Sequence, residues 1–334
     1  MSNTDFYNDL PKLRQCIEEF KKLEKDFQKE FGLKDIVSNS KIYEIAIANK
    51  LGHKILSKMS NSKDAIDSDG GLIEYKHFKE TSSNHSWTFN DYSDRTIEAL
   101  KDVKHVVFAH YNDTKDNPLN FDWYYDAKGW EISDYLFEAT KTIKNKRKMI
   151  NVSPKQLEEK VNLKKLYVNI ELSGIYSNLI ERYISLAKEM EYLSGTTGIL
   201  TSNKLWEVVV GLELGHKVNS EQGGRGGAHD AEDIEGGTYE YKVAKSGSWN
   251  FQDISENVLS KYLKDKAIIT AKVDKENFEI VEILSISPQI LVPHLRLKLE
   301  KKRKSFEKKG KELRRLQVSV GKREMENLGA TKLL

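Results

Sequence analysis

Two stretches of the 334-residue chain share one pattern: DAIDSDGGLIEYK at residues 64–76 and DAEDIEGGTYEYK at residues 230–242. Eight of their thirteen positions are identical, and they align without a gap. A Gly-Gly pair divides each stretch, and apolar and charged side chains alternate after it. This pattern predicts a β-hairpin whose return strand carries its charged residues on one face. Glu74 and Lys76 then share a face, and so do their counterparts in the second stretch.

The repeat extends beyond the hairpin. KIYEIAIANKLGHK at 41–54 matches KLWEVVVGLELGHK at 204–217 in six of fourteen positions, and SWTF at 86–89 matches SWNF at 248–251. The three blocks follow one another in the same order in both copies. A period of this length indicates a duplicated domain rather than a solenoid of small units.

The blocks also predict secondary structure and fold class. The first block has apolar residues at helical spacing, and a glycine ends it where a left-handed cap is expected. Ser153 followed by Pro154 is typical of a helix start, and a second helical pattern runs from Leu166 to Met190. Strands are expected at 104–111, 121–125, 266–273 and 277–284. We therefore expect an α/β protein with two tandem domains, each a central mixed sheet flanked by helices.

The predicted organisation has five parts. They are an N-terminal helical segment (1–40), a first repeat (41–140), a helical bridge (141–200), a second repeat (201–295) and a basic C-terminal segment (296–334).

Charge is distributed unevenly along the chain. Formal net charge is +3, but residues 296–323 hold thirteen Lys or Arg against three Glu, so the remainder is net negative. Such a basic segment indicates contact with a polyanion, and a solvated, salt-bridged helix is the alternative interpretation.

Other classes of protein are disfavoured. The single cysteine, Cys16, excludes an internal disulfide framework and a cysteine-based zinc site. No apolar run approaches the ~18 residues that span a bilayer, and the N-terminus lacks a secretory pattern, so we expect a cytoplasmic protein without a membrane partner.

The hairpin gathers groups suited to phosphodiester hydrolysis. Asp64 precedes Glu74 by ten residues and Lys76 follows two later; Asp230, Glu240 and Lys242 repeat this spacing. Two carboxylates can share Mg²⁺, which completes its coordination with waters and phosphate oxygens. The ion can acidify a water, and a neighbouring lysine can orient that water or offset developing negative charge.

This Asp–x9–Glu–x–Lys arrangement, with the aspartate opening one strand and Glu-x-Lys on the next, resembles the PD-(D/E)xK nuclease superfamily. Within it, DA…GG…EYK resembles type II restriction endonucleases. The resemblance implies a restriction-endonuclease-like fold in each repeat. It also implies two catalytic triads, in which Asp64, Glu74, Asp230 and Glu240 hold Mg²⁺ beside Lys76 and Lys242, with Glu44 and Glu207 near the metal.

Two points depart from the pattern or stay open. Lys63 and His229 stand before the aspartates, where many members have proline. Asp67 or Asp233 could replace Asp64 or Asp230 as the ligand; we favour the first of each pair because it lies farther from the turn, in the strand.

The function hypothesis is a type II restriction endonuclease that cuts double-stranded DNA at a specific sequence, with one active site per strand. We expect it to act as a monomer or weak dimer, beside a cognate DNA methyltransferase. The alternatives are a repair, structure-selective or nicking nuclease, and a non-catalytic DNA-binding protein on a nuclease fold. The residues expected to contact DNA are Lys79, Lys245, Arg225, Arg303, Arg314 and Arg315.

Overall fold

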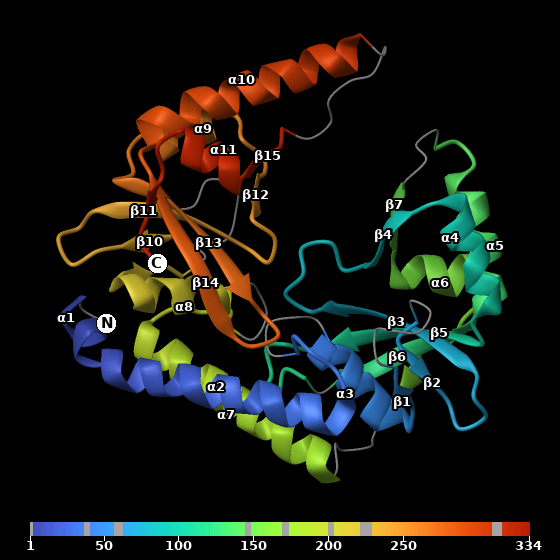
Figure 1. Ribbon diagram of the computed structural model, residues 1–334. Coiled ribbons are helices and arrows are strands. Elements are labelled where there is room, and N and C mark those ends of the chain that lie inside the picture. Colours follow the sequence, from blue (N-terminus) through green and yellow to red (C-terminus); the bar gives the residue numbers. More distant parts are fainter. Residues whose placement is uncertain are drawn as a thin grey trace. The chain divides into compact units, whose positions relative to one another are not determined.

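The computed structural model describes residues 3–36, 41–56, 63–119, 121–143, 148–168, 174–199, 204–220, 229–308 and 316–334. These residues form two compact units. The first unit contains the first repeat and comprises the described residues of 26–36 and 41–184. The second unit contains the second repeat and comprises the described residues up to 25 and from 185 onward (Figure 1).

The predicted hairpin is present in the first unit as β2 (Ala65–Ile66) and β3 (Leu72–Lys79), which pair antiparallel. Asp67 closes the turn, because its Oδ1 accepts the backbone N–H of Asp69 at 2.9 Å and of Gly71 at 2.8 Å. Gly70 has φ +81°, a conformation that favours glycine. The repeated Gly-Gly pair therefore reflects a backbone requirement.

The second unit builds the same hairpin from β10 (Ala231–Glu232) and β11 (Thr238–Ala244). Asp233 Oδ1 accepts from the backbone N–H of Glu235 at 3.0 Å and of Gly237 at 2.8 Å. The two turns are thus closed by the same bonds.

Each unit contains a mixed six-stranded sheet, and the two sheets have one topology. The strand order is β1-β2-β3-β5-β6-β8 in the first unit and β9-β10-β11-β13-β14-β16 in the second. Only the central pairs, β3 with β5 and β11 with β13, are parallel among the described strands. The other sheet strands are β1 (Lys54–Ile55), β5 (His105–Tyr111), β6 (Phe121–Lys128), β8 (Leu166–Tyr167), β9 (Lys217–Val218), β13 (Ala267–Asp274), β14 (Glu279–Ile286) and β16 (Thr331–Lys332).

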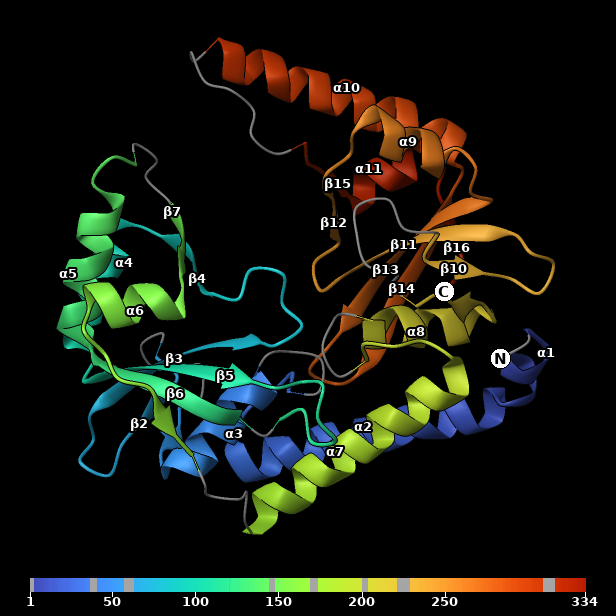
Figure 2. The same ribbon diagram turned by 180° about the vertical axis from the view of Figure 1, so that it is seen from behind.

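Helices cover both faces of each sheet, as Figure 1 and the reverse view in Figure 2 show. In the first unit, α3 (Lys41–Leu51) covers the face we call the helix-α3 face, where Tyr43 stacks on His77. The opposite face packs against α4 (Asp94–Glu98), η1 (Ala99–Asp102) and α5 (Gly129–Thr140). In the second unit, the corresponding elements are α8 (Lys204–Leu214), α9 (Glu256–Tyr262) and α10 (Pro288–Glu307).

A two-stranded ribbon completes each unit. β4 (Trp87–Tyr92) pairs with β7 (Lys148–Val152), and β12 (Ser248–Phe251) pairs with β15 (Val318–Gly321). The repeated tryptophans anchor these ribbons to the core, because Trp87 Nε1 donates to the carbonyl of Ala109 and Trp249 Nε1 to that of Ala271, both at 2.9 Å.

The elements confirm most of the local predictions and correct others. Helix α6 (Pro154–Lys160) begins at the expected Ser153 cap, and α3 and α8 end before glycines with positive φ. The continuous helix expected from Leu166 is wrong, since 166–167 form the edge strand β8 and α7 begins at Gly174.

The chain after each predicted repeat also returns to the sheet of that repeat. Residues 141–200 contain β7, α6 and β8 before α7, so only their last part is a long helix. Residues 296–334 contain the end of α10, then β15, α11 (Lys322–Asn327) and β16. Both segments are therefore parts of the repeat domains, because their strands pair with distant strands and complete the fold. Such long-range pairing has no local sequence pattern.

Helices α2 (Leu10–Phe31) and α7 (Gly174–Ser194) contribute residues to both units and lie side by side in both views. In the first unit, Arg182 pairs with Asp26 at 2.8 Å. A short helix, α1 (Asn3–Asn8), precedes them. Among the described helices, none is sufficiently long and apolar to cross a bilayer.

One glycine of the first unit tests this packing. A Cβ at Gly129 would stand 2.1 Å from the Leu100 carbonyl oxygen and 2.2 Å from that of Val103. We expect Gly129→Ala to destabilise the protein by about 1–3 kcal/mol, because backbone atoms must move. Urea denaturation measures this, with Gly247→Ala as control, since its Cβ would meet only Lys322 Cβ at 3.5 Å. Equal midpoints for the two variants would contradict the packing.

Candidate active site

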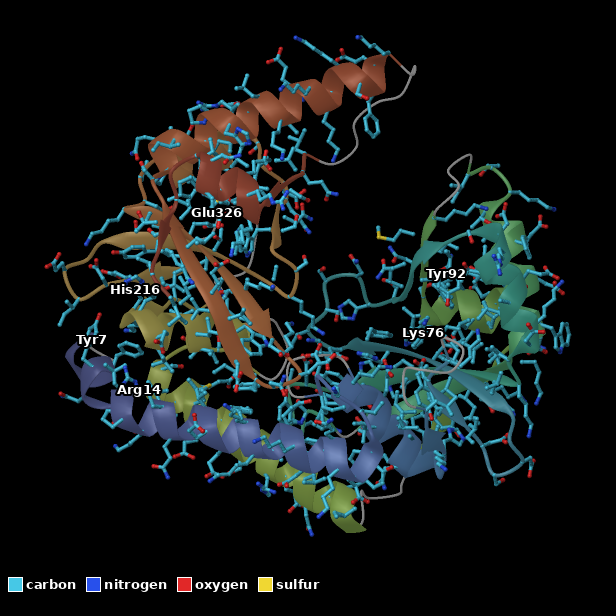
Figure 3. The ribbon with its side chains drawn as sticks, viewed as in Figure 1. Tyr7, Arg14, Lys76, Tyr92, His216 and Glu326 are labelled. Carbon is cyan, nitrogen blue, oxygen red and sulfur yellow. The ribbon has the colours of Figure 1, made fainter. Side chains whose placement is uncertain are left out.

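The three predicted groups of the first unit lie together at the hairpin. Asp64 stands just before β2, and its Oδ2 accepts the backbone N–H of Tyr75 at 2.8 Å. Lys76 Nζ donates to Glu74 Oε1 at 2.5 Å and to the carbonyl of Tyr75 at 3.2 Å. The main chain between the glutamate and the lysine therefore holds the aspartate; Figure 3 labels Lys76 in this setting.

The second unit repeats these contacts. Asp230 Oδ2 accepts the backbone N–H of Tyr241 at 2.8 Å. Lys242 Nζ donates to Glu240 and, at 3.0 Å, to the carbonyl of Tyr241. All six predicted catalytic residues are thus brought together, three in each unit.

The helix of the first block adds a third carboxylate. In the first unit, Lys41 Nζ contacts the carboxylate of Glu44 and lies 3.4 Å from Asp64 Oδ1. Burial raises the pKa of Glu44 to about 7, and the negative charge of Asp64 adds to this, although Lys41 acts in the opposite direction. A carboxylate with a raised pKa beside another is a mark of functional sites.

The second unit again agrees. Lys204 contacts Glu207 and lies 3.9 Å from Asp230 Oδ1. Burial and the neighbouring Asp230 raise the pKa of Glu207 to about 7. Glu44 and Glu207, expected near the metal, thus lie beside the predicted ligands Asp64 and Asp230.

The triad lysines are held as cations. Burial lowers the pKa of Lys76, but the charge of Glu74 outweighs this effect and the net pKa is raised. The same opposition, with Glu240 as the main partner, raises the pKa of Lys242. Both side chains therefore keep their protons at neutral pH.

Geometry separates the two aspartates that the sequence left open. The Asp67 carboxylate closes the turn and pairs with Lys104 at 2.6 Å, which lowers its pKa to about 2. The Asp64 carboxylate, in contrast, lies beside Lys41 and Glu44. The carboxylate of Asp67 is thus engaged by the turn and by Lys104, whereas Asp64 is the aspartate next to the other acidic groups.

The donor set fits a hard divalent cation. Mg²⁺ takes one or two carboxylates and keeps several waters, which matches Asp64 with Glu74. The raised pKa of Glu44 is consistent with this, because a cation would relieve its repulsion with Asp64. Within the described ranges, no three His, Cys, Asp or Glu side chains form a ready-made metal cluster. A Mg²⁺ ion held by two carboxylates would keep waters or take substrate oxygens in its other positions.

The expected DNA-contacting residues are dispersed. Lys79 ends β3 and, by strand alternation, lies on the opposite face from Lys76; Lys245 is exposed just after β11. Arg303 is exposed on α10, where Arg296, Lys298 and Lys304 pair with glutamates, as the salt-bridged interpretation expected. Arg225, Arg314 and Arg315 lie outside the described residues.

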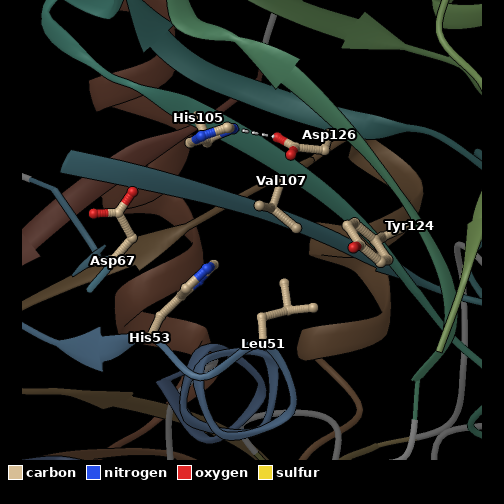
Figure 4. Close-up of a pocket in the computed structure, with 7 residues that line it drawn as sticks. All are labelled: Leu51, His53, Asp67, His105, Val107, Tyr124 and Asp126. Atoms are coloured by element: carbon tan, nitrogen blue, oxygen red, sulfur yellow. Dashed lines mark hydrogen bonds and ion pairs between the residues drawn. The ribbon is translucent and has the colours of Figure 1, made fainter. Parts of the chain in front are cut away.

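A polar pocket lies on the helix-α3 face of the first unit (Figure 4). Its lining includes His53 and His105, and His105 Nδ1 lies 2.8 Å from Asp126 Oδ1. His53 Nδ1 is hydrogen-bonded to the hydroxyl of Tyr75 at 2.8 Å. The Tyr75 side chain points to the opposite face of β3 from Glu74 and Lys76. The pocket therefore lies on the other face of the sheet from Glu74 and Lys76.

Sequence reasoning missed two pairs of residues at the site. Lys41 and Lys204 open the first repeated block, so their identity was a visible signal. Tyr92 and Tyr262 contact the triad glutamates but do not align between the repeats, so the repeat gave no sign of them.

No model of a known protein family matches this chain, and no curated protein matches it in sequence.

The pKa of Glu44 and Glu207 predicts a pH dependence of the metal-free protein. Both folded values, about 7, exceed the ordinary 4.5, so folding takes up protons between these limits. The free energy of unfolding contributed by these groups must therefore fall as pH rises from 4.5 to 7. We expect Glu44→Gln with Glu207→Gln to flatten this fall.

Thermal unfolding in EDTA from pH 5 to 8 measures the effect. Glu138→Gln serves as control, because Glu138 is an exposed residue paired with Lys141. Parallel Tm profiles for the wild type and the double variant would contradict the raised pKa values.

Proposed function

We propose that this chain is a Mg²⁺-dependent, sequence-specific endonuclease of double-stranded DNA, with a restriction-endonuclease-like domain and one active site in each unit. As a type II restriction enzyme, the protein would act as a monomer or weak dimer beside a DNA methyltransferase that protects the same sequence.

One observation carries the proposal: the same five charged groups and the same contacts occur twice. Each unit has an Asp bound by the N–H between Glu and Lys, the strand Lys–Glu pair, and a helix Lys–Glu pair next to that Asp. Six of fourteen and eight of thirteen residues are identical in the two blocks that supply them. A strand face that is merely solvated would not produce two copies of a largely buried charged cluster, because taking charged groups out of water is costly.

The residues divide the chemistry between them. Asp64 and Glu74 would hold Mg²⁺, which supplies an acidified water and stabilises charge on the phosphate. Lys76 stays protonated and serves as a fixed cation rather than as a base. Of its three N–H donors, Glu74 and the Tyr75 carbonyl take two. We assign the third to the attacking water or to a phosphate oxygen.

Removing each triad lysine tests the division of labour. We expect Lys76→Ala and Lys242→Ala each to slow cleavage of one strand by about a hundredfold or more, as loss of an electrostatic stabiliser does. Each variant should therefore nick supercoiled phage or plasmid DNA, with the nicks in opposite strands, while the wild type makes discrete double-strand cuts. Gel electrophoresis and sequencing of the ends provide the measurement.

Lys141→Ala is the matched control, since Lys141 is exposed in the first unit. DNA binding without cleavage over a range of divalent metals would refute catalysis and leave the DNA-binding alternative. Cleavage confined to branched or mismatched duplexes would instead favour the repair alternative.

The two aspartates of each hairpin provide a second test. We expect Asp64→Asn to abolish cleavage by the first unit, because it removes a charge next to Glu44. Asp67→Asn should keep cleavage within a few-fold, since an amide oxygen can still accept the N–H groups of the turn. Nicking assays in a Lys242→Ala background compare them. The reverse result would move the ligand assignment to Asp67.

A further inference from the structure

In both units, one phenylalanine and one tyrosine cover the lysine–glutamate pair. In the first unit, Lys76 Nζ lies 5.3 Å from the ring centre of Phe89 and 6.0 Å from that of Tyr92. The hydroxyl of Tyr92 donates to Glu74 Oε1 at 3.2 Å. Figure 3 labels Lys76 and Tyr92, which come from β3 and β4.

The second unit has the same cover. Lys242 Nζ lies 6.0 Å from the ring centre of Phe251 and 5.9 Å from that of Tyr262. The hydroxyl of Tyr262 is hydrogen-bonded to Glu240. The phenylalanines are counterparts in the SWTF and SWNF blocks, but the tyrosines are not.

Alignment of these blocks continues without a gap through the next helix. Ser93 and Ser255 are counterparts, and each caps a helix with its side chain. Lys104 and Lys266 are counterparts too, and each pairs with the aspartate that closes its turn. The register between these points is therefore fixed by structure as well as by sequence.

In this register, the tyrosines have exchanged places with aliphatic residues. Tyr92 aligns with Ile254, and Leu100 aligns with Tyr262. Ile254 and Leu100 are fully buried. One unit delivers the hydroxyl from the end of β4, and the other delivers it from the end of α9.

The exchange separates packing from hydrogen bonding. Ile254 and Leu100 show that an aliphatic side chain fills either place, so neither place needs a tyrosine for volume. A buried hydroxyl carries a desolvation cost unless it finds a partner. Two copies that merely tolerated a tyrosine would not place its hydroxyl on the same carboxylate from different positions.

Resting on the proposed function, we propose that Tyr92 and Tyr262 are positioning residues for the metal-binding glutamates. Lys76 and Tyr92 both bind Oε1 of Glu74, which fixes the rotation of the carboxylate and assigns Oε2 to Mg²⁺. The tyrosine ring also holds the ammonium group through its π face. Neither tyrosine is assigned a contact with DNA.

The test uses the full chain with Lys242→Ala, so that only the first unit cuts. Tyr92→Phe removes the hydroxyl and keeps the ring. We expect the rate of single-turnover nicking to fall about tenfold to a hundredfold. The Mg²⁺ affinity of the first unit should fall by a similar factor. Calorimetry measures that affinity in a chain that carries Asp230→Asn instead of Lys242→Ala. DNA affinity in EDTA should not change. Tyr125→Phe is the control, because Tyr125 is a buried tyrosine of the same core bonded to Glu158.

An exchange variant provides rescue. Tyr92→Ile should be impaired like Tyr92→Phe, and Tyr92→Ile with Leu100→Tyr should recover to within a few-fold, because it copies the second unit. The mirror pair, Tyr262→Leu with Ile254→Tyr, is measured in a Lys76→Ala background, where only the second unit cuts, and covers the case in which the first pair fails to fold.

The outcomes separate this proposal from the proposed function. Wild-type rates and Mg²⁺ affinity in Tyr92→Phe, or folded exchange variants that do not recover, would overturn the positioning role and leave the nuclease intact. A wild type that binds Mg²⁺ but cuts no DNA would refute the nuclease, while the Mg²⁺ affinities of the tyrosine variants still decide the positioning role. A wild type that binds no Mg²⁺ would overturn both.

Discussion

Three carboxylates can share one largely buried end of a sheet only if cations offset the cost of taking them out of water. In the first unit these carboxylates belong to Glu44, Asp64 and Glu74, and the cations are Lys41 and Lys76. Lys41 lies three residues before Glu44 on the same helix, and Lys76 lies two residues after Glu74 on the same strand. Helix and strand geometry alone therefore brings each lysine next to its glutamate. The one long-range requirement is that α3 meets the hairpin. Tyr111 secures it on the helix-α3 face, since its hydroxyl donates to the Tyr43 carbonyl at 2.7 Å.

This constraint explains which parts of the repeat have stayed alike. The hairpin must place the Asp64 carboxylate over the Tyr75 N–H, and a slip of one residue would turn Glu74 and Lys76 to the other face. The Asp67 cap, the Gly-Gly turn and the parallel pairing of β3 with β5 fix that register. The same residue types recur in the second unit, whereas the loops between the blocks have different lengths.

The sequence predicted what local patterns determine. The hairpin, the cap at Ser153 and the strands near 104–111 and 266–273 depend on alternation, turn residues and capping, which act over a few positions. It did not predict β7 and β15, because pairing with β4 and β12 brings together residues far apart in the chain. Lys41 was visible as an identity, but its place beside Asp64 depends on packing of a helix against a hairpin. No sequence pattern indicated Tyr92 and Tyr262, because they occupy different positions in the two repeats. What they have in common is their contact with the triad glutamate.

The two faces of the sheet show where divergence was permitted. On the helix-α3 face, Ile73 and His105 of the first unit correspond to Tyr239 and Ala267 of the second, and Tyr239 stacks on His216 with ring centres 4.0 Å apart. The second unit therefore has alanine where His105 lines the polar pocket of the first unit. On the opposite face, even a change of residue at the tyrosine positions is matched by a second change that returns a hydroxyl to the glutamate. On the helix-α3 face the contact of His53 with Tyr75 is also kept, as His216 with Tyr241, both at 2.8 Å. Around the lysine–glutamate pairs, however, a contact is kept even where the residue that makes it has moved to another position.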